Sequence, residues 1–152
     1  MTVSTTSISK STSGNGSATS FPYDYKILEA SDLQVIIRSA TGAETIKATS
    51  TYTVTGVGAD SGTIVFNSSN VPASGETVVV TRNVLQTQAI DYIANDPFPA
   101  ETHEEGLDRA TMVIQQVSGD ADRSIKISKT NTIGSTEFTT SAADRANKVL
   151  SF

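Results

Sequence analysis

Residues 91–117 read DYIANDPFPAETHEEGLDRATMVIQQV, and this stretch separates two kinds of sequence. Before it, the chain is rich in Ser, Thr, Val and Ile and is punctuated by Gly, Pro and Asn, a composition that favours short strands. Within it, apolar residues recur at helical spacing after a rigid Asp-Pro-Phe-Pro run. We therefore predict a β-rich domain followed by a helix that begins near residues 100–102 and ends within residues 118–122, with Gly119 as its terminator.

The predicted helix carries a short heptad pattern. Its apolar residues are spaced three, four, three and four apart, as at the a and d positions of a coiled coil, and their small and β-branched side chains suit the axis of a parallel trimer. The same residues could instead pack against the β-rich domain of their own chain, and periodicity alone does not separate the two readings. Our prediction is a trimer interface made of Leu107, Ala110, Ile114, Val117 and Ala121, continued by Ile125 and Ile127.

The first ninety residues predict a mainly β fold, either an antiparallel β-sandwich or a small Greek-key barrel. We expect Pro22 at a sheet edge or at the start of its strand, because proline lacks the donor that an inner strand needs. We expect Ile46 to face inward, with Glu44 and Lys47 facing outward. A further short strand is expected at residues 124–129. The predicted strands of the domain are residues 5–10, 21–25, 33–38, 44–48, 51–55, 62–67 and 77–82.

Composition excludes several classes of function. The net charge of −5 with scattered basic residues disfavours nucleic-acid binding, and the absence of Cys removes disulfides and thiolate chemistry. No apolar run is long enough for a membrane span or a signal peptide, so we expect synthesis in the cytoplasm and no membrane partner. The apolar ending Val-Leu-Ser-Phe at residues 149–152 leads us to expect that the natural sequence continues beyond it.

Reactive-site patterns fail on spacing. His103 with Glu104 and Glu105 lacks a second His one helical turn away, so a metal site is not expected. The glycines at residues 56–62 lack the Lys and the following helix of a phosphate-binding loop. A hydrolase would have to use Asp91, Asp96 or Glu101, and we predict neither an enzyme nor a cofactor or small-molecule substrate.

Several segments in order resemble the N-terminal anchor domain of tail fibres and tailspikes from short-tailed bacteriophages. The most specific is the FPAE-x-HE-x-x-LDR-x-T-M run at residues 98–112, and Gly106 departs from the helix former expected there. The other matching segments are residues 21–38, 52–56, 62–67, 71–88, 91–97, 113–117, 124–128 and 143–152.

The resemblance implies a homotrimeric structural protein of the virion that docks onto adaptor and nozzle (tubular) proteins of the phage tail, close to the portal, for host attachment. It divides the chain into an N-terminal arm (1–20), a tail-docking β-sandwich (21–96), a linker and trimerising helix (97–124) and the start of a fibre shaft (125–152). The expected docking residues are Val3, Ile8, Tyr92, Ile93 and Phe98.

One function of a different class competes with this reading. A stand-alone β-sandwich could recognise a carbohydrate of the host surface. The chain contains no Trp and few aromatic residues, and such sites depend on aromatic stacking, so we rank this alternative second.

Overall fold

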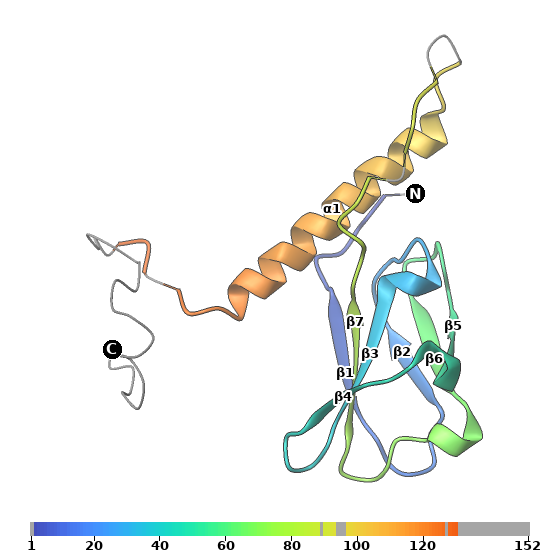
Figure 1. Ribbon diagram of the computed structural model, residues 1–152, viewed down its shortest axis with the longest axis vertical. Helices are drawn as coiled ribbons and strands as arrows, with labels where there is room; N and C mark the ends of the chain where they lie inside the picture. Colours follow the sequence, from blue (N-terminus) through green and yellow to red (C-terminus); the bar gives the residue numbers. More distant parts are fainter. Residues whose placement is uncertain (1, 89, 94–96, 127, 131–152) are drawn as a thin grey trace, which may run out of the picture.

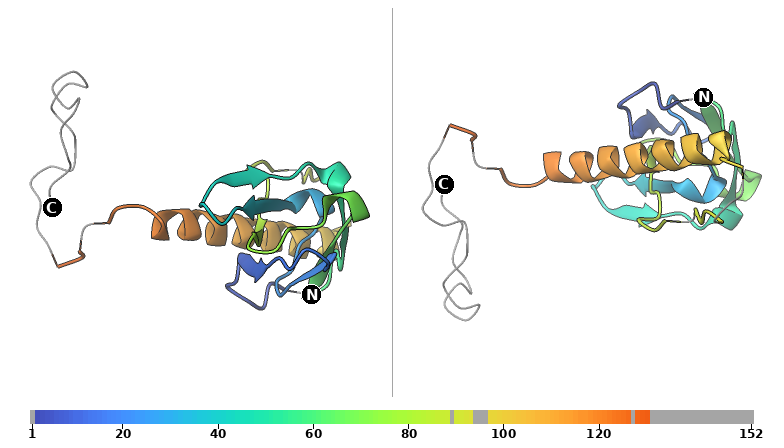
Figure 2. Two further views of the ribbon diagram at one scale, coloured as in Figure 1. Left: turned by 90° about the horizontal axis from the view of Figure 1, so that it is seen from below. Right: turned by 90° about the horizontal axis from the view of Figure 1, so that it is seen from above.

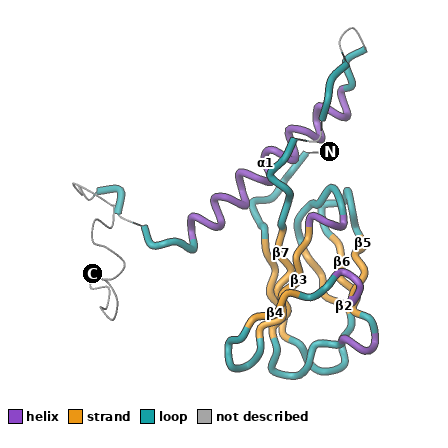
Figure 3. The backbone as a smooth tube through the Cα atoms, in the orientation of Figure 1, coloured by secondary structure: helices purple, strands orange, loops and turns teal. Residues whose placement is uncertain are grey.

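Two antiparallel sheets form the first half of the protein, as seen in a computed structural model that describes residues 2–88, 90–93, 97–126 and 128–130 (Figure 1). One sheet has the order β1-β7-β3-β4 and the other the order β2-β6-β5. Three single turns of 3-10 helix, at Ala30–Asp32, Thr49–Thr51 and Ser68–Asn70, join strands of different sheets (Figure 3). The strands are β1 Ser9–Ser13, β2 Ser20–Tyr23, β3 Leu33–Arg38, β4 Glu44–Ile46, β5 Tyr52–Thr55, β6 Gly62–Phe66 and β7 Thr77–Arg82.

Alternating side chains place one hydrophobic core between the sheets. In β7 the burial alternates residue by residue, because successive side chains of a strand point to opposite faces. No pairing joins the two sheets among the described strands, so they do not close into a barrel. The prediction of a mainly β fold with antiparallel sheets and one following helix is confirmed. The buried core consists of Phe21, Tyr23, Tyr25, Ile27, Leu33, Val35, Ile37, Tyr52, Ile64, Phe66, Val78 and Val80.

Two core tyrosines bond their hydroxyl groups to strand carbonyls. The hydroxyl of Tyr23 donates to the Thr55 carbonyl at 2.6 Å, and that of Tyr25 donates to the Val80 carbonyl at 2.8 Å. Burial raises the pKa of Tyr23 to about 12 and raises the pKa of Tyr25 further, because a phenolate would be poorly solvated there. The two rings therefore remain neutral. Tyr23 links β2 to β5 within one sheet, and Tyr25 links the segment after β2 to β7 of the other sheet.

The strand predictions fail in two places. The first strand begins at Ser9, later than expected. It does lie at a sheet edge, and so does β2, which contains Pro22. The inward placement of Ile46 is wrong, since its side chain is 64% exposed. Ile46 pairs directly with Ile36, and directly paired residues share a face, which here is the outer face of the sheet.

The predicted helix is α1, Ala100–Asp122, and follows Pro99. Gly119 does not end it, so that prediction is wrong. A side chain at Gly119 would collide with Ile8, and one at Gly106 would collide with Ile90, so both glycines allow another segment to approach the helix closely. The sequence predicts a short strand at residues 124–129. The described residues of that segment form no strand.

Helix α1 crosses one end of the β domain, and its carboxyl end projects beyond the sheets (Figures 1 and 2). After β7, the described residues 83–88 and 90–93 run alongside α1 in the opposite direction (Figure 1). Residues 2–8, the first part of the predicted N-terminal arm, lie between α1 and the start of β1. Three separate segments therefore meet at this end of the β domain.

Candidate functional site

One face of α1 packs onto its own chain. This inner face comprises Asp108, Met112, Gln115 and Gly119, which recur at spacings of four, three and four and so lie in one line along the helix. Met112 is completely buried and Asp108 nearly so, although most of the face is polar. Hydrogen bonds and ion pairs, more than apolar area, therefore fix the helix on the β domain.

A buried ion pair lies at the centre of this contact. The Nζ atom of Lys26 is 2.6 Å from Oδ2 of Asp108, and each side chain is only 7% exposed. The other carboxylate oxygen of Asp108 accepts the backbone N–H of Val3 at 3.1 Å. Because a buried charge is costly unless it is paired and hydrogen-bonded, this geometry holds helix, sheet and arm in one arrangement.

Arg82 makes a second link between arm and helix. Its guanidinium donates to Oε1 of Gln115 at 2.7 Å and to the carbonyl of Ser7 at 3.2 Å, and it lies over the ring of Tyr25. Gln115 in turn donates to the carbonyl of Thr5 at 2.9 Å. Burial lowers the pKa of the Arg82 guanidinium, whereas the nearby Tyr25 and Asp32 act to raise it. Arg82 and Gln115 thus bond to each other, and each also bonds to a backbone carbonyl of the arm.

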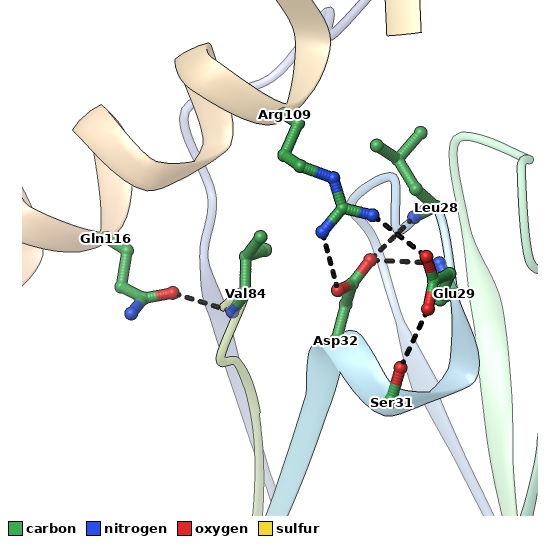
Figure 4. A network of polar contacts seen from close by, with 7 residues as sticks. All are labelled: Leu28, Glu29, Ser31, Asp32, Val84, Arg109 and Gln116. Carbon is green, nitrogen blue, oxygen red and sulfur yellow. Dashed lines mark hydrogen bonds and ion pairs between the residues drawn. The ribbon is translucent and has the colours of Figure 1, made fainter. Parts of the chain in front are cut away.

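The flank of the inner face adds two contacts, which Figure 4 shows together. Arg109 is 3.0 Å from a carboxylate oxygen of Glu29 and 3.8 Å from one of Asp32, and Asp32 also accepts the backbone N–H groups of residues 28 and 29. Gln116 accepts the backbone N–H of Val84 at 2.9 Å. These bonds tie the helix to one end of the β3–β7 strand pair, where β3 begins and β7 ends.

The predicted trimer residues lie on the opposite face of α1, which we call the seam. Leu107 is 59% exposed, Ile114 69% and Val117 51%, and Ala110 and Ala121 are also exposed. The seam therefore does not pack against its own β domain, which was the alternative reading of the heptad. Ile125 is exposed just after the helix, and Ile127 lies outside the described residues.

The predicted tail-docking residues fall into two groups. Val3 and Ile8 are half-buried in the arm, where Val3 bonds Asp108 and Ile8 lies against Gly119. In contrast, Tyr92, Ile93 and Phe98 are exposed at the amino end of α1. Val3 and Ile8 therefore pack against other parts of their own chain, whereas Tyr92, Ile93 and Phe98 remain accessible.

The residues considered for catalysis form no recognisable reactive centre. Asp91 and Glu101 are exposed, Asp96 lies outside the described residues, and no three metal-binding side chains gather within the described part of the chain. Glu101, Glu104 and Glu105 border a hollow of about 260 Å³ beside Lys26 and Asp108. Among the described helices, none is long and apolar enough to cross a membrane.

The polar inner face escaped the sequence reasoning. Polar residues on an amphipathic helix normally face water, and the sequence analysis makes no prediction for Asp108, Arg109 or Gln115. The available signal was their own periodicity, since residues 108, 112, 115 and 119 repeat opposite the seam. Of their partners in the β domain, Arg82 continues the alternation of Val78 and Val80 along β7, whereas Lys26 lies outside any strand and has no such pattern.

Comparison with known proteins gives one informative match. No protein-family model matches the chain. The chain is similar to the tail spike protein of Salmonella phage epsilon15, with 41% identity over 120 residues. The match covers 77% of this chain and 11% of that protein, so the chain spans about a tenth of its relative's length. Over most of its length the chain is therefore homologous to one part of a bacteriophage tail spike protein, which confirms its resemblance to tail fibre and tailspike proteins.

Proposed function

We propose that this chain is the structural region that joins a trimeric fibre or spike to the tail of a short-tailed bacteriophage virion. In this proposal the seam of α1 assembles three copies, and the β domain is held by adaptor and nozzle proteins of the tail, near the portal. The protein would be made in the cytoplasm of the host bacterium and would act in the virion during host attachment. Its similarity to a tail spike protein supports the tail location.

The exposed seam is the observation that carries the trimer proposal. A monomeric protein rarely leaves a row of large apolar side chains in water, and such surfaces mark contacts with other chains. Here the opposite face of the same helix already has its partners, so the seam remains available to identical copies. Its heptad spacing is that of parallel helices around a common axis.

Light-scattering mass of the chain over a range of concentrations tests the trimer. Wild type should approach three times the 15.9 kDa of one chain as concentration rises, and Ile114→Asp should remain monomeric. Ile46→Asp is the matched control, because Ile46 is 64% exposed against 69% for Ile114 but lies on β4, away from α1. Equal masses for wild type and Ile114→Asp at every concentration would contradict the proposal.

Cysteine cross-linking extends this test to weak assemblies. The chain has no Cys, so Ile114→Cys introduces a single thiol, and Ile46→Cys provides the same thiol elsewhere. A three-armed maleimide reagent should produce covalent trimers from Ile114→Cys because three seams share one axis. Yields no higher than those of Ile46→Cys would exclude close approach of the seams.

Attachment to the tail is tested by binding to tail particles that lack fibres. The chain should bind them and should compete with intact fibres, with its apparent affinity raised by the three linked copies. Ile114→Asp should bind more weakly, because a monomer loses that multivalency. Absence of binding by the trimeric chain would argue against the attachment role.

The carbohydrate-binding alternative receives no support from the aromatic residues of the β domain. Five aromatic side chains of the β domain, Phe21, Tyr23, Tyr25, Tyr52 and Phe66, are all buried in the core, so they offer no stacking platform to a sugar. A glycan array remains a direct check. Specific binding of one glycan by the chain would revive this alternative.

A further inference from the structure

An aromatic cluster lies at the amino end of α1, outside the β-domain core. The hydroxyl of Tyr92 is 2.9 Å from Nδ1 of His103, and the Phe98 ring centroid is 5.1 Å from that of His103. Tyr92 is 48% exposed and Phe98 67% exposed, and together with Ile93 and two prolines they border a largely apolar hollow of about 670 Å³. We call Tyr92, Phe98 and His103 the aromatic cluster.

The heptad register connects this cluster to the seam. His103 lies four residues before Leu107 and seven before Ala110, so it occupies the next seam position toward the amino end. Because Tyr92 and Phe98 both pack on His103, their rings extend the apolar surface of the seam past the first turn of the helix. Exposed apolar or aromatic residues thus recur along one face of the helix from His103 to Val117, with Tyr92 and Phe98 packed at its amino end.

The size of the seam explains why this extension matters. Five seam residues, two of them Ala, give each chain little apolar surface, whereas stable interfaces bury about 800 Å² on each partner. Each aromatic side chain can bury roughly 150–250 Å². The cluster is therefore the nearest surface able to enlarge a contact that the seam begins.

We propose that the aromatic cluster is the amino-terminal part of the interface between copies of this chain. In this interface a second copy fills the hollow beside each cluster. The proposal rests on the proposed trimer and reassigns Tyr92, Ile93 and Phe98 from tail docking to trimer assembly. The Tyr92–His103 hydrogen bond satisfies two polar atoms that this contact would cover. Three clusters would then surround the axis where the helices begin.

The test compares Phe98→Asp with Ile114→Asp and the Ile46→Asp control, using light-scattering mass against concentration. Phe98 is exposed in the single chain, so its replacement should leave the circular dichroism spectrum unchanged. We expect Phe98→Asp to raise the concentration needed for half-assembly at least tenfold, and Phe98→Leu to raise it much less. Phe98→Cys should also form covalent trimers with the three-armed reagent.

The outcomes separate this inference from the proposed function. If Ile114→Asp prevents assembly while Phe98→Asp does not, the cluster lies outside the interface and the trimer stands. If Phe98→Asp assembles normally but no longer binds fibreless tails, the cluster belongs to the tail contact, and the inference is overturned. If neither variant differs from the Ile46→Asp control, both proposals fail.

Discussion

At the scale of single residues, the contact between α1 and the β domain depends on side chains that usually face water. Lys26, Arg82 and Asp108 are each at most 5% exposed, and every one of them has a charged or hydrogen-bonding partner. Only the Nε atom of Arg82 is buried without a hydrogen bond among the described residues. Since such pairs are directional, they specify one placement of the helix where an apolar contact would tolerate several.

Removing one partner of the buried ion pair should be costly. Asp108→Ala leaves the Lys26 ammonium buried without its carboxylate and should lower the free energy of unfolding by about 3 kcal/mol. The double variant Lys26→Met, Asp108→Leu should recover much of this loss. Urea titration measures both.

The exposed pair of Lys10 and Asp24 provides a control for that prediction. Its atoms are 2.7 Å apart, but the side chains are 43% and 53% exposed. Asp24→Ala should therefore cost less than about 1 kcal/mol. Equal losses of unfolding free energy for Asp24→Ala and Asp108→Ala would mean that burial does not determine how much the Lys26–Asp108 pair stabilises the fold.

Gly119 offers a second prediction at this scale. Alanine normally stabilises a helix by about 1 kcal/mol relative to glycine. At Gly119 the added methyl group would collide with Ile8, so Gly119→Ala should bring no gain in the wild-type background. In an Ile8→Ala background the same change should be stabilising by about 1 kcal/mol, and a double-mutant cycle by urea unfolding measures the difference. Additive effects would contradict the contact.

At the scale of elements, the sequence predicts the strands and the helix well because each has a strong period of its own. The seam follows a heptad pattern in the sequence, and β3 and β7 correspond to runs of β-branched residues. Whether the heptad faced its own chain was not predictable, because that depends on partners distant in sequence, such as Lys26 for Asp108. The misplacement of Ile46 has the same origin, since its face follows from its pairing with Ile36.

The link between β2 and β5 should respond to alkaline pH. The pKa of Tyr23 is about 12 in the folded protein against 10 for an unburied tyrosine, so the folded state retains its proton longer than the unfolded state. The contribution of Tyr23 to stability should therefore be constant below about pH 10 and be lost as the pH rises from about 10 to about 12. Tyr23→Phe should make this fall shallower in urea titrations at several pH values. An unchanged slope would show that Tyr23 is not responsible.

At the scale of the whole molecule, the β domain has a core that owes nothing to α1. All members of the core and the residues packed on it lie between Ala18 and Val80, and the buried Met112 is outside that cluster. The helix thus adds a second, smaller contact to a domain already complete. This division is compatible with our proposal that the β domain is held by the tail while α1 assembles three copies.

A chain that ends after residue 93 should therefore retain its two sheets. We expect its far-UV circular dichroism to show β structure and its melting temperature to fall by several degrees, because the Lys26 and Arg82 contacts with the helix are lost. Dispersed amide resonances in an NMR spectrum would confirm a folded domain. A spectrum typical of an unfolded chain would show that α1 is part of the core.

The reversal of the chain between β7 and α1 has a mechanical consequence. The covalent connection enters the helix at its amino end, whereas a shaft would pull on its carboxyl end (Figure 1). Tension would first load the contacts near Gly119 and Gln115, and only after these had separated would the connecting segment carry the force. A helix of 23 residues is about 35 Å long, so its release would lengthen the joint by a comparable distance. If the chain joins a fibre to a tail as we propose, the polar inner face would then act as a reversible, extensible link in that joint.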